Sequence, residues 1–95
     1  MDKTDFEAQL RRDGYLDVRT KCLDPGTALT NHSHKFDTRL LVLGGEIIIT
    51  YGEQQLTYRA NEILEIERGV EHSEHYGAGP FEFVVGLRHE PVNCS

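Results

Sequence analysis

The sequence has 95 residues, a length that fits one domain and leaves no room for two. Its formal net charge is -6, and no run of Lys or Arg is present, so nucleic acid and an anionic membrane surface would be poor partners. No apolar stretch approaches the length of a membrane span, and the opening residues MDKTDFEAQLRRDGY are charged where a signal peptide would be apolar. We therefore expect a soluble, cytoplasmic protein with one domain over residues 1–95.

A short helix is predicted near the start of the chain, over about residues 5–13. Thr4 and Glu7 have the spacing of a capping box, with Thr4 as the N-cap. Phe6 and Leu10 are four residues apart and share one helix face. Gly14 can adopt the left-handed conformation that often ends a helix. We expect this helix to be a packing or interface element.

From residue 15 to about residue 90 the pattern changes to short strands separated by turns. The predicted strands are YLDVRTKCL, RLLVLGGEIIITY, QLTYR, EILEIE, HSEHY and FEFVVGLR. The turns DPGT, GEQ, RGVE and GAGP each contain Gly, and two of them contain Pro. About seven strands at this spacing predict a β-sandwich or a closed barrel. Cys22 and Cys94 lie far apart without CxxC spacing, which favours two free thiols.

Three of the five histidines are candidate metal ligands. His32 and His34 are two residues apart, so on a strand their imidazoles would point into the same volume. His72 lies at the start of a later strand, whereas His75 has the opposite parity and is expected to point away. His75 and His89 are therefore left out of the site. The spacing alone leaves open whether these histidines bind a metal or simply lie on a solvent-exposed face of the sheet.

The spacing around these histidines resembles the two sequence motifs of the cupin superfamily. The first motif, G-x5-H-x-H-x3-E-x6-G, is matched here by Gly26, His32, His34 and Gly45, with Thr38 in the place of the glutamate. The second motif, G-x5-P-x-G-x2-H-x3-N, keeps only Gly69 and His72, with other residues at Asn61, Glu67 and Tyr76. Together the two motifs span residues 26–76, more than half of the chain.

This resemblance implies an all-β cupin jelly-roll barrel with a short N-terminal helix, and a homodimer by family habit. It also implies that His32, His34 and His72 hold a divalent transition metal, Fe, Zn, Mn or Ni, inside the barrel. The expected function is to bind or transform a small molecule, with dioxygenase- and isomerase-type chemistry among the options. The alternatives are a non-enzymatic binding or sensing module and a metal-free, degenerate cupin dimer. The sequence does not decide whether the protein is an enzyme.

The fourth ligand position is the open question, because Thr38 is a neutral hydroxyl and a poor metal ligand. Glu74 is two residues after His72 and shares its face on a regular strand, so we expect it to be the fourth ligand or a general base. The alternatives are water, a Glu74 that is merely solvated, and Asp37 bending inward. Asp37 is expected instead to form a surface pair with Arg39, opposite Thr38. Apolar residues such as Leu40 and Val42 are expected to line the cavity.

Overall fold

A computed structural model describes residues 1–89, and within them one helix precedes eight strands. The helix is α1 (Lys3–Arg12). The strands are β1 (Leu16–Leu23), β2 (Ala28–His32), β3 (Phe36–Gly44), β4 (Glu46–Tyr51), β5 (Gln54–Arg59), β6 (Ile63–Ile66), β7 (His72–Tyr76) and β8 (Phe81–His89). The predicted all-β fold with an N-terminal helix is confirmed, although the prediction did not separate β2 as a strand of its own. Cys94 lies outside the described residues, and Cys22 is exposed.

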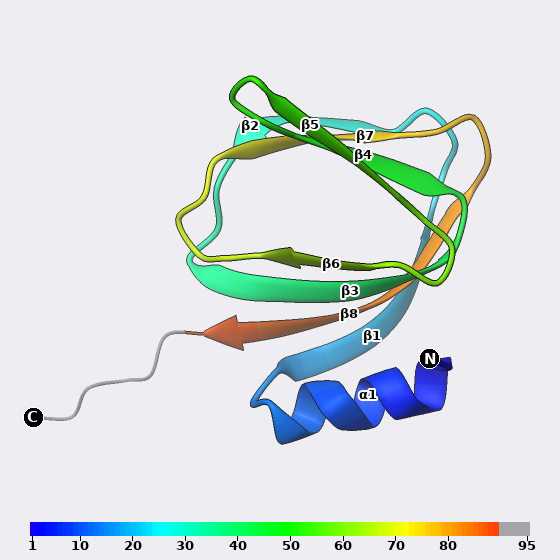
Figure 1. The fold of residues 1–95 in the computed structure, drawn as a ribbon, viewed down its shortest axis with the longest axis vertical. Helices are drawn as coiled ribbons and strands as arrows, with labels where there is room; N and C mark the ends of the chain where they lie inside the picture. The colour runs from blue at the N-terminus through cyan, green and yellow to red at the C-terminus, as the bar shows by residue number, and fades with distance from the viewer. Residues whose placement is uncertain (90–95) are drawn as a thin grey trace, which may run out of the picture.

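The strands form two antiparallel four-stranded sheets that face each other as two layers (Figure 1). The first sheet has the order β1-β8-β3-β6 and the second sheet has the order β2-β7-β4-β5. The first and last strands of each order are edge strands, and β3, β8, β4 and β7 are central. This interleaved order is that of a jelly roll. Helix α1 covers the outer face of the first sheet (Figure 1).

The main core fills the space between the two sheets. On β4, Ile47 and Ile49 are fully buried, whereas Ile48 between them is only partly buried. This alternation follows the two-residue period of a strand, which sends every second side chain inward. Phe81, Phe83 and Val85 follow the same rule on β8. The side chains of the main core are therefore those that the strands turn toward the space between the sheets.

A second, smaller core lies between α1 and the first sheet. Phe6 and Leu10 are fully buried there, as the helical spacing predicted, and they pack with Tyr15, Leu41 and Val84. A Cβ added at Gly86 would lie 3.1 Å from atoms of Leu10 and of Tyr15, so the glycine lets the helix lie close to β8. Within residues 1–89 no helix is long and apolar enough to span a membrane.

The start of the helix differs from the prediction. Asp2, not Thr4, is the N-cap, and its side chain accepts a hydrogen bond from the backbone N–H of Asp5 at 2.8 Å. The predicted capping box of Thr4 and Glu7 is therefore wrong, because an aspartate two residues earlier satisfies the first free N–H groups. At the other end, Gly14 has a φ of 84° and leads the chain from α1 into β1, as predicted.

Candidate metal centre

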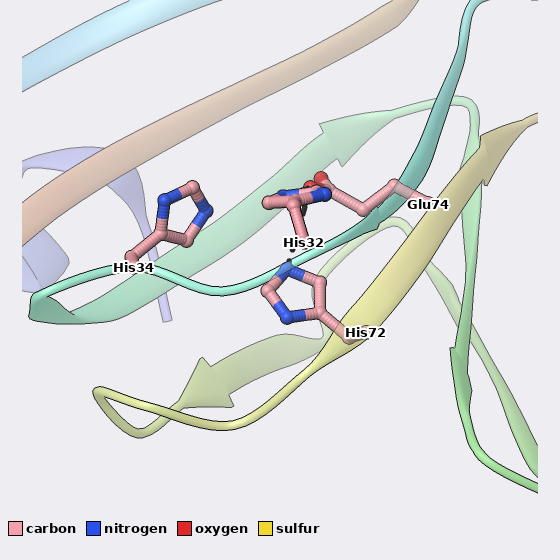
Figure 2. Close-up of side chains that lie close together, drawn as sticks. All are labelled: His32, His34, His72 and Glu74. Atoms are coloured by element: carbon pink, nitrogen blue, oxygen red, sulfur yellow. Dashed lines mark ion pairs between the residues drawn. The ribbon is translucent and has the colours of Figure 1, made fainter.

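Three histidines and one glutamate come together at one end of the barrel interior (Figure 2). Each offers one ligand atom, and these atoms all lie within 4.8 Å of one another. His32 is the last residue of β2, and its Cα partner is His72, the first residue of β7. Glu74 lies two residues farther along β7. The structure thus brings together the three histidines and the carboxylate that the sequence predicted.

The fourth member, His34, lies beyond the end of β2 in the short connection to β3. The two histidines of the HxH pair therefore do not share a regular strand, contrary to the prediction. A backbone hydrogen bond holds the connection in place, because the N–H of Gly69 donates to the carbonyl oxygen of His34 at 2.8 Å. Gly69 has a φ of 81°, a conformation that favours glycine and explains this residue in the turn before β7.

Two of the histidine rings are held by the backbone through the nitrogen that faces away from the cluster. The Nδ1 atom of His32 lies 2.7 Å from the carbonyl oxygen of Thr30, and that of His72 lies 3.0 Å from the carbonyl oxygen of Val70. A carbonyl oxygen can only accept, so each Nδ1 donates. In the neutral ring the lone pair then belongs to Nε2. Such contacts fix the orientation of metal-binding histidines.

The two carboxylate oxygens of Glu74 have separate partners. Oε2 lies 3.0 Å from Nε2 of His32 and 3.5 Å from Nε2 of His72 (Figure 2). Oε1 accepts a hydrogen bond from the hydroxyl of Tyr76 at 2.7 Å. Burial, followed by the contact with Glu74, raises the pKa of Tyr76, which keeps its hydroxyl protonated as a donor. Tyr76 therefore holds Glu74 with Oε2 facing the histidines.

The cluster has the properties of a cation-binding site. Nε2 of His72 is fully buried and has no hydrogen-bond partner anywhere in residues 1–89. A buried polar atom without a partner costs about 1–3 kcal/mol. Because Nδ1 of each ring donates to the backbone, the Nε2 lone pairs of the neutral His32 and His72 point at a carboxylate oxygen of Glu74, and these groups repel one another. A proton or a metal ion between the nitrogens and the oxygen would turn this repulsion into attraction. Imidazole and carboxylate ligands suit divalent transition metals, so the residues fit such an ion.

His34 is positioned by a ring rather than by the backbone. Its imidazole stacks on Phe36, with the ring centroids 4.7 Å apart and the planes 17° from parallel. Burial, followed by the neighbouring His32 and His72, lowers the pKa of His34. The lowered pKa favours the neutral ring, which is the form that binds a metal.

Thr38 faces the same cavity as Glu74, but it does not belong to the four-residue cluster. The carboxylate therefore comes from β7 in the second sheet, and not from the first-motif position on β3. Asp37, the other candidate, is also absent from the cluster. It is buried elsewhere, and its two oxygens accept hydrogen bonds from Arg68 and Arg88 at 2.9–3.2 Å.

The predicted surface pair of Asp37 and Arg39 is therefore wrong. Asp37 lies on a central strand, where its Cα partner on β8 is Arg88. Arg39 contacts Asp13 at 2.6 Å and Glu65 at 2.8 Å instead. The sequence did not reveal these partners because they come from distant parts of the chain.

A cavity of about 320 Å³ opens beside the cluster, and His34, Thr38, Glu74 and Tyr76 are among its lining residues. Leu40 lines it, as predicted. Val42 does not, although it shares the inward face of β3, because it lies farther along the strand and is fully buried in the main core.

The remaining histidines lie outside the cluster. His75 is exposed, in agreement with its parity on β7, and His89 is exposed at the end of β8. The sequence reasoning missed the role of Tyr76 in holding Glu74. The signal was present, because Tyr76 follows Glu74 by two residues and shares its face.

The pattern around these residues matches a known family. A family model described as "Cupin domain" matches residues 19–87. The chain belongs to the cupin family. The resemblance in the two motifs and the jelly-roll topology agree with this result, whereas none of the curated protein sequences matches the chain significantly.

Solved structures share the fold of this cupin at low sequence identity. A conserved protein of unknown function from Streptococcus pyogenes has 19% identity and a TM-score of 0.68, with 79% of this chain and 65% of that chain covered. A cupin superfamily protein from Desulfitobacterium hafniense has 19% identity and a TM-score of 0.65, with coverage of 77% and 66%. A predicted oxalate decarboxylase from Thermotoga maritima has 16% identity and a TM-score of 0.65, with coverage of 86% and 73%.

This cupin therefore spans slightly less than two thirds of the length of the first two of these proteins. Identities of this size establish the fold that the proteins share.

Proposed function

We propose that this cupin binds one divalent transition metal ion through His32, His34, His72 and Glu74, and that a small molecule binds beside the ion in the barrel cavity. The observation that carries the proposal is the buried Nε2 atom of His72, which has no hydrogen-bond partner within residues 1–89. A metal ion at this point would satisfy that nitrogen and would separate the facing lone pairs of the cluster. Fe, Zn, Mn and Ni all suit this ligand set.

The protein residues would then have distinct tasks. The backbone carbonyls of Thr30 and Val70 orient His32 and His72, and Phe36 orients His34. Tyr76 orients Glu74 as the fourth ligand or as a general base. A bound metal would supply Lewis acidity and positions for a ligand, as dioxygenase- or isomerase-type chemistry needs.

One observation favours a second candidate, a non-enzymatic binding or sensing module. Both oxygens of Glu74 are already engaged, Oε1 by the hydroxyl of Tyr76 and Oε2 by the histidines. A carboxylate held in this way is better placed to bind a metal than to accept a proton from a substrate. Oxygen consumption by the Fe(II)-loaded protein, measured across candidate substrates, separates an oxygenase from the binding module. Oxygen consumption with any substrate supports an oxygenase, and no consumption with any of them counts against an oxygenase.

Elemental analysis tests the metal site directly. Protein without a His-tag, purified without chelators, is compared with His72→Ala and with His75→Ala, a control on the same strand that is exposed and outside the cluster. We expect about one metal ion per chain in the wild type and in His75→Ala, and almost none in His72→Ala. No metal in the wild type, or equal metal in His72→Ala, would contradict the proposal.

A homodimer and a cytoplasmic location are part of the same proposal. The exposed apolar residues Leu16, Leu29, Leu56 and Ile63 all lie on the edge strands β1, β2, β5 and β6, where a second copy can cover them. The exposed thiol of Cys22 suits a reducing compartment. Light scattering coupled to gel filtration tests the dimer, and cell fractionation tests the location.

A further inference from the structure

The cavity beside the metal centre has two positively charged side chains on one wall. Arg19 and Lys21, both on β1, line the same cavity as His34 and Glu74. Their Cα partners on β8 are Val85 and Phe83, which belong to the core between the sheets. Directly opposed residues of an antiparallel pair share one face of the sheet. Arg19 and Lys21 therefore lie on the interior face of β1, at the exposed edge of the first sheet.

The charged groups of these two side chains have no polar partner in the described residues. In the part of the chain that the structure describes, Arg19 and Lys21 make no hydrogen bond or ion pair, whereas Arg39, Arg59 and Arg88 each contact a carboxylate. Both residues are exposed on the edge strand β1, and both line the cavity. Their charges are free to meet a ligand.

The backbone of β1 is distorted next to these two residues. The register with β8 shifts between Leu16 and Arg19, which marks a β-bulge. Asp17 in this bulge has a φ of 53°, in the left-handed region that residues other than glycine rarely adopt. The bulge changes the alternation of the strand just before Arg19, which then lies opposite Val85. Such strain is common where a strand aims side chains at a ligand.

The charged residues that line the cavity indicate the charge of its ligand. The positive charges of Arg19 and Lys21 are balanced by Asp17 and Glu74, which also line the cavity. A divalent ion at the metal centre would leave the cavity with a net positive charge. Apolar side chains, among them Phe36 and Leu40, also line the cavity. The volume of about 320 Å³ is at the low end for ligand pockets, which span roughly 300–1,000 Å³.

We propose that the ligand of this cavity is a small organic anion with a short apolar body, whose charged group is bound by Arg19 and Lys21 while its other end faces the metal centre. The inference rests on the proposed metal site for the second contact, but the role of the two cations can be tested separately. Arginine is suited to paired hydrogen bonds with a planar carboxylate, and lysine adds a point charge beside it.

The test measures binding of defined probes by isotope-edited NMR, with both the zinc-loaded and the metal-free protein. The anionic probes are butyrate, succinate and propylphosphonate, and the neutral counterparts are butyramide and succinamide. The variant is Arg19→Gln/Lys21→Gln. The matched control is Lys3→Gln/Arg11→Gln, which removes two positive charges from α1, on the far side of the first sheet from the cavity.

We expect the anions to bind and the amides not to bind, and the Arg19→Gln/Lys21→Gln variant to lose at least about tenfold in affinity. The control should match the wild type, and zinc content should be the same in all three proteins. The ratio of carboxylate to phosphonate affinity identifies the chemistry of the anion. Arg19→Lys/Lys21→Arg, which keeps both charges, should retain part of the binding if the double variant has altered stability.

The inference is wrong if no anion shifts resonances of residues that line the cavity, if amides bind as well as acids, or if the variant binds anions as tightly as the wild type. If the zinc content is unchanged in any of these cases, the proposed metal site is not contradicted. Conversely, absence of zinc from the wild type would refute the metal site alone. In that case anion binding by the metal-free protein that is lost in the variant would still support the two cations.

Discussion

Removal of the Tyr76 hydroxyl tests whether Glu74 is a metal ligand. Tyr76→Phe leaves the ring in place, and its contact with the ring of Phe81, at 5.0 Å between centroids, is unchanged. The substitution removes one hydrogen bond, the 2.7 Å contact from the hydroxyl to Oε1 of Glu74. It therefore affects the orientation of the carboxylate and very little else in the barrel.

The magnitude follows from the kind of bond that is lost. A hydrogen bond to a charged group contributes about 1.5–3 kcal/mol, and about 1.4 kcal/mol corresponds to a factor of ten in an equilibrium constant. Removal of a group that orients a metal ligand commonly weakens metal binding by about 10- to 100-fold, which is the same range. We expect the dissociation constant for zinc to rise by this factor in Tyr76→Phe.

Competition with a chromogenic chelator measures this constant in the wild type, Tyr76→Phe and Tyr58→Phe. Tyr58 is a partly buried tyrosine packed against the main core, and the cluster does not include it, so its variant should match the wild type. An unchanged constant in Tyr76→Phe would refute the idea that Tyr76 holds Glu74 for metal binding. An equal loss in Tyr58→Phe would show a general effect of losing a tyrosine hydroxyl in the barrel.

Three further substitutions test other parts of the structure. The pKa of Asp37 is held well below its usual range by hydrogen bonds from two arginines. Its contribution to stability is therefore full near pH 7, and it is lost as the pH falls from the unfolded value of about 3.9 through the lower folded pKa. Asp37→Asn should lower the free energy of unfolding by about 2 kcal/mol at pH 7 and flatten that acid dependence, as urea titrations at several pH values can measure. Gly86→Val should lower the melting temperature, because its side chain would press on Leu10 and Tyr15, and overpacking costs about 1–3 kcal/mol. Gly79→Ala is the control, because a Cβ at Gly79 meets no atom within 4 Å. Equal melting temperatures in the wild type and Gly86→Val would contradict the close approach of α1 to β8. Glu74→Gln should weaken zinc affinity, and Thr38→Glu in that background should restore part of it, because both positions line one cavity; an unaltered affinity in Glu74→Gln would remove this carboxylate from the ligands.

The resemblance to the two cupin motifs indicated the three histidines of the candidate site, and local periodicity indicated Glu74. The same-face rule placed Glu74 beside His72 and turned His75 outward, because parity along one strand depends only on neighbouring residues. Whether the four-residue cluster binds a metal remains a prediction.

The sequence did not predict the partners of Asp37 or the burial of Val42. The first depends on residues distant in the chain, and the second depends on the position of the residue along the barrel axis. Asp37 was assigned to Arg39 because the two are close in the chain, but Arg68 and Arg88 arrive from other strands. Leu40 and Val42 have the same parity, and only the folded barrel shows where the core ends and the cavity begins. The sequence offers no rule for either outcome.

The position of the carboxylate has a consequence for how cupins are recognised. The first motif expects the acidic ligand at Thr38 on β3, whereas the carboxylate of the four-residue cluster is Glu74 on β7, in the opposite sheet. Because both sheets face one interior, a carboxylate on either sheet can lie beside the same three histidines, and if Glu74 binds a metal, the motif glutamate is not required. A survey that treats loss of the motif glutamate as loss of metal binding would then overlook chains of this kind. Acidic residues two positions after the second-motif histidine are the feature by which to search for them.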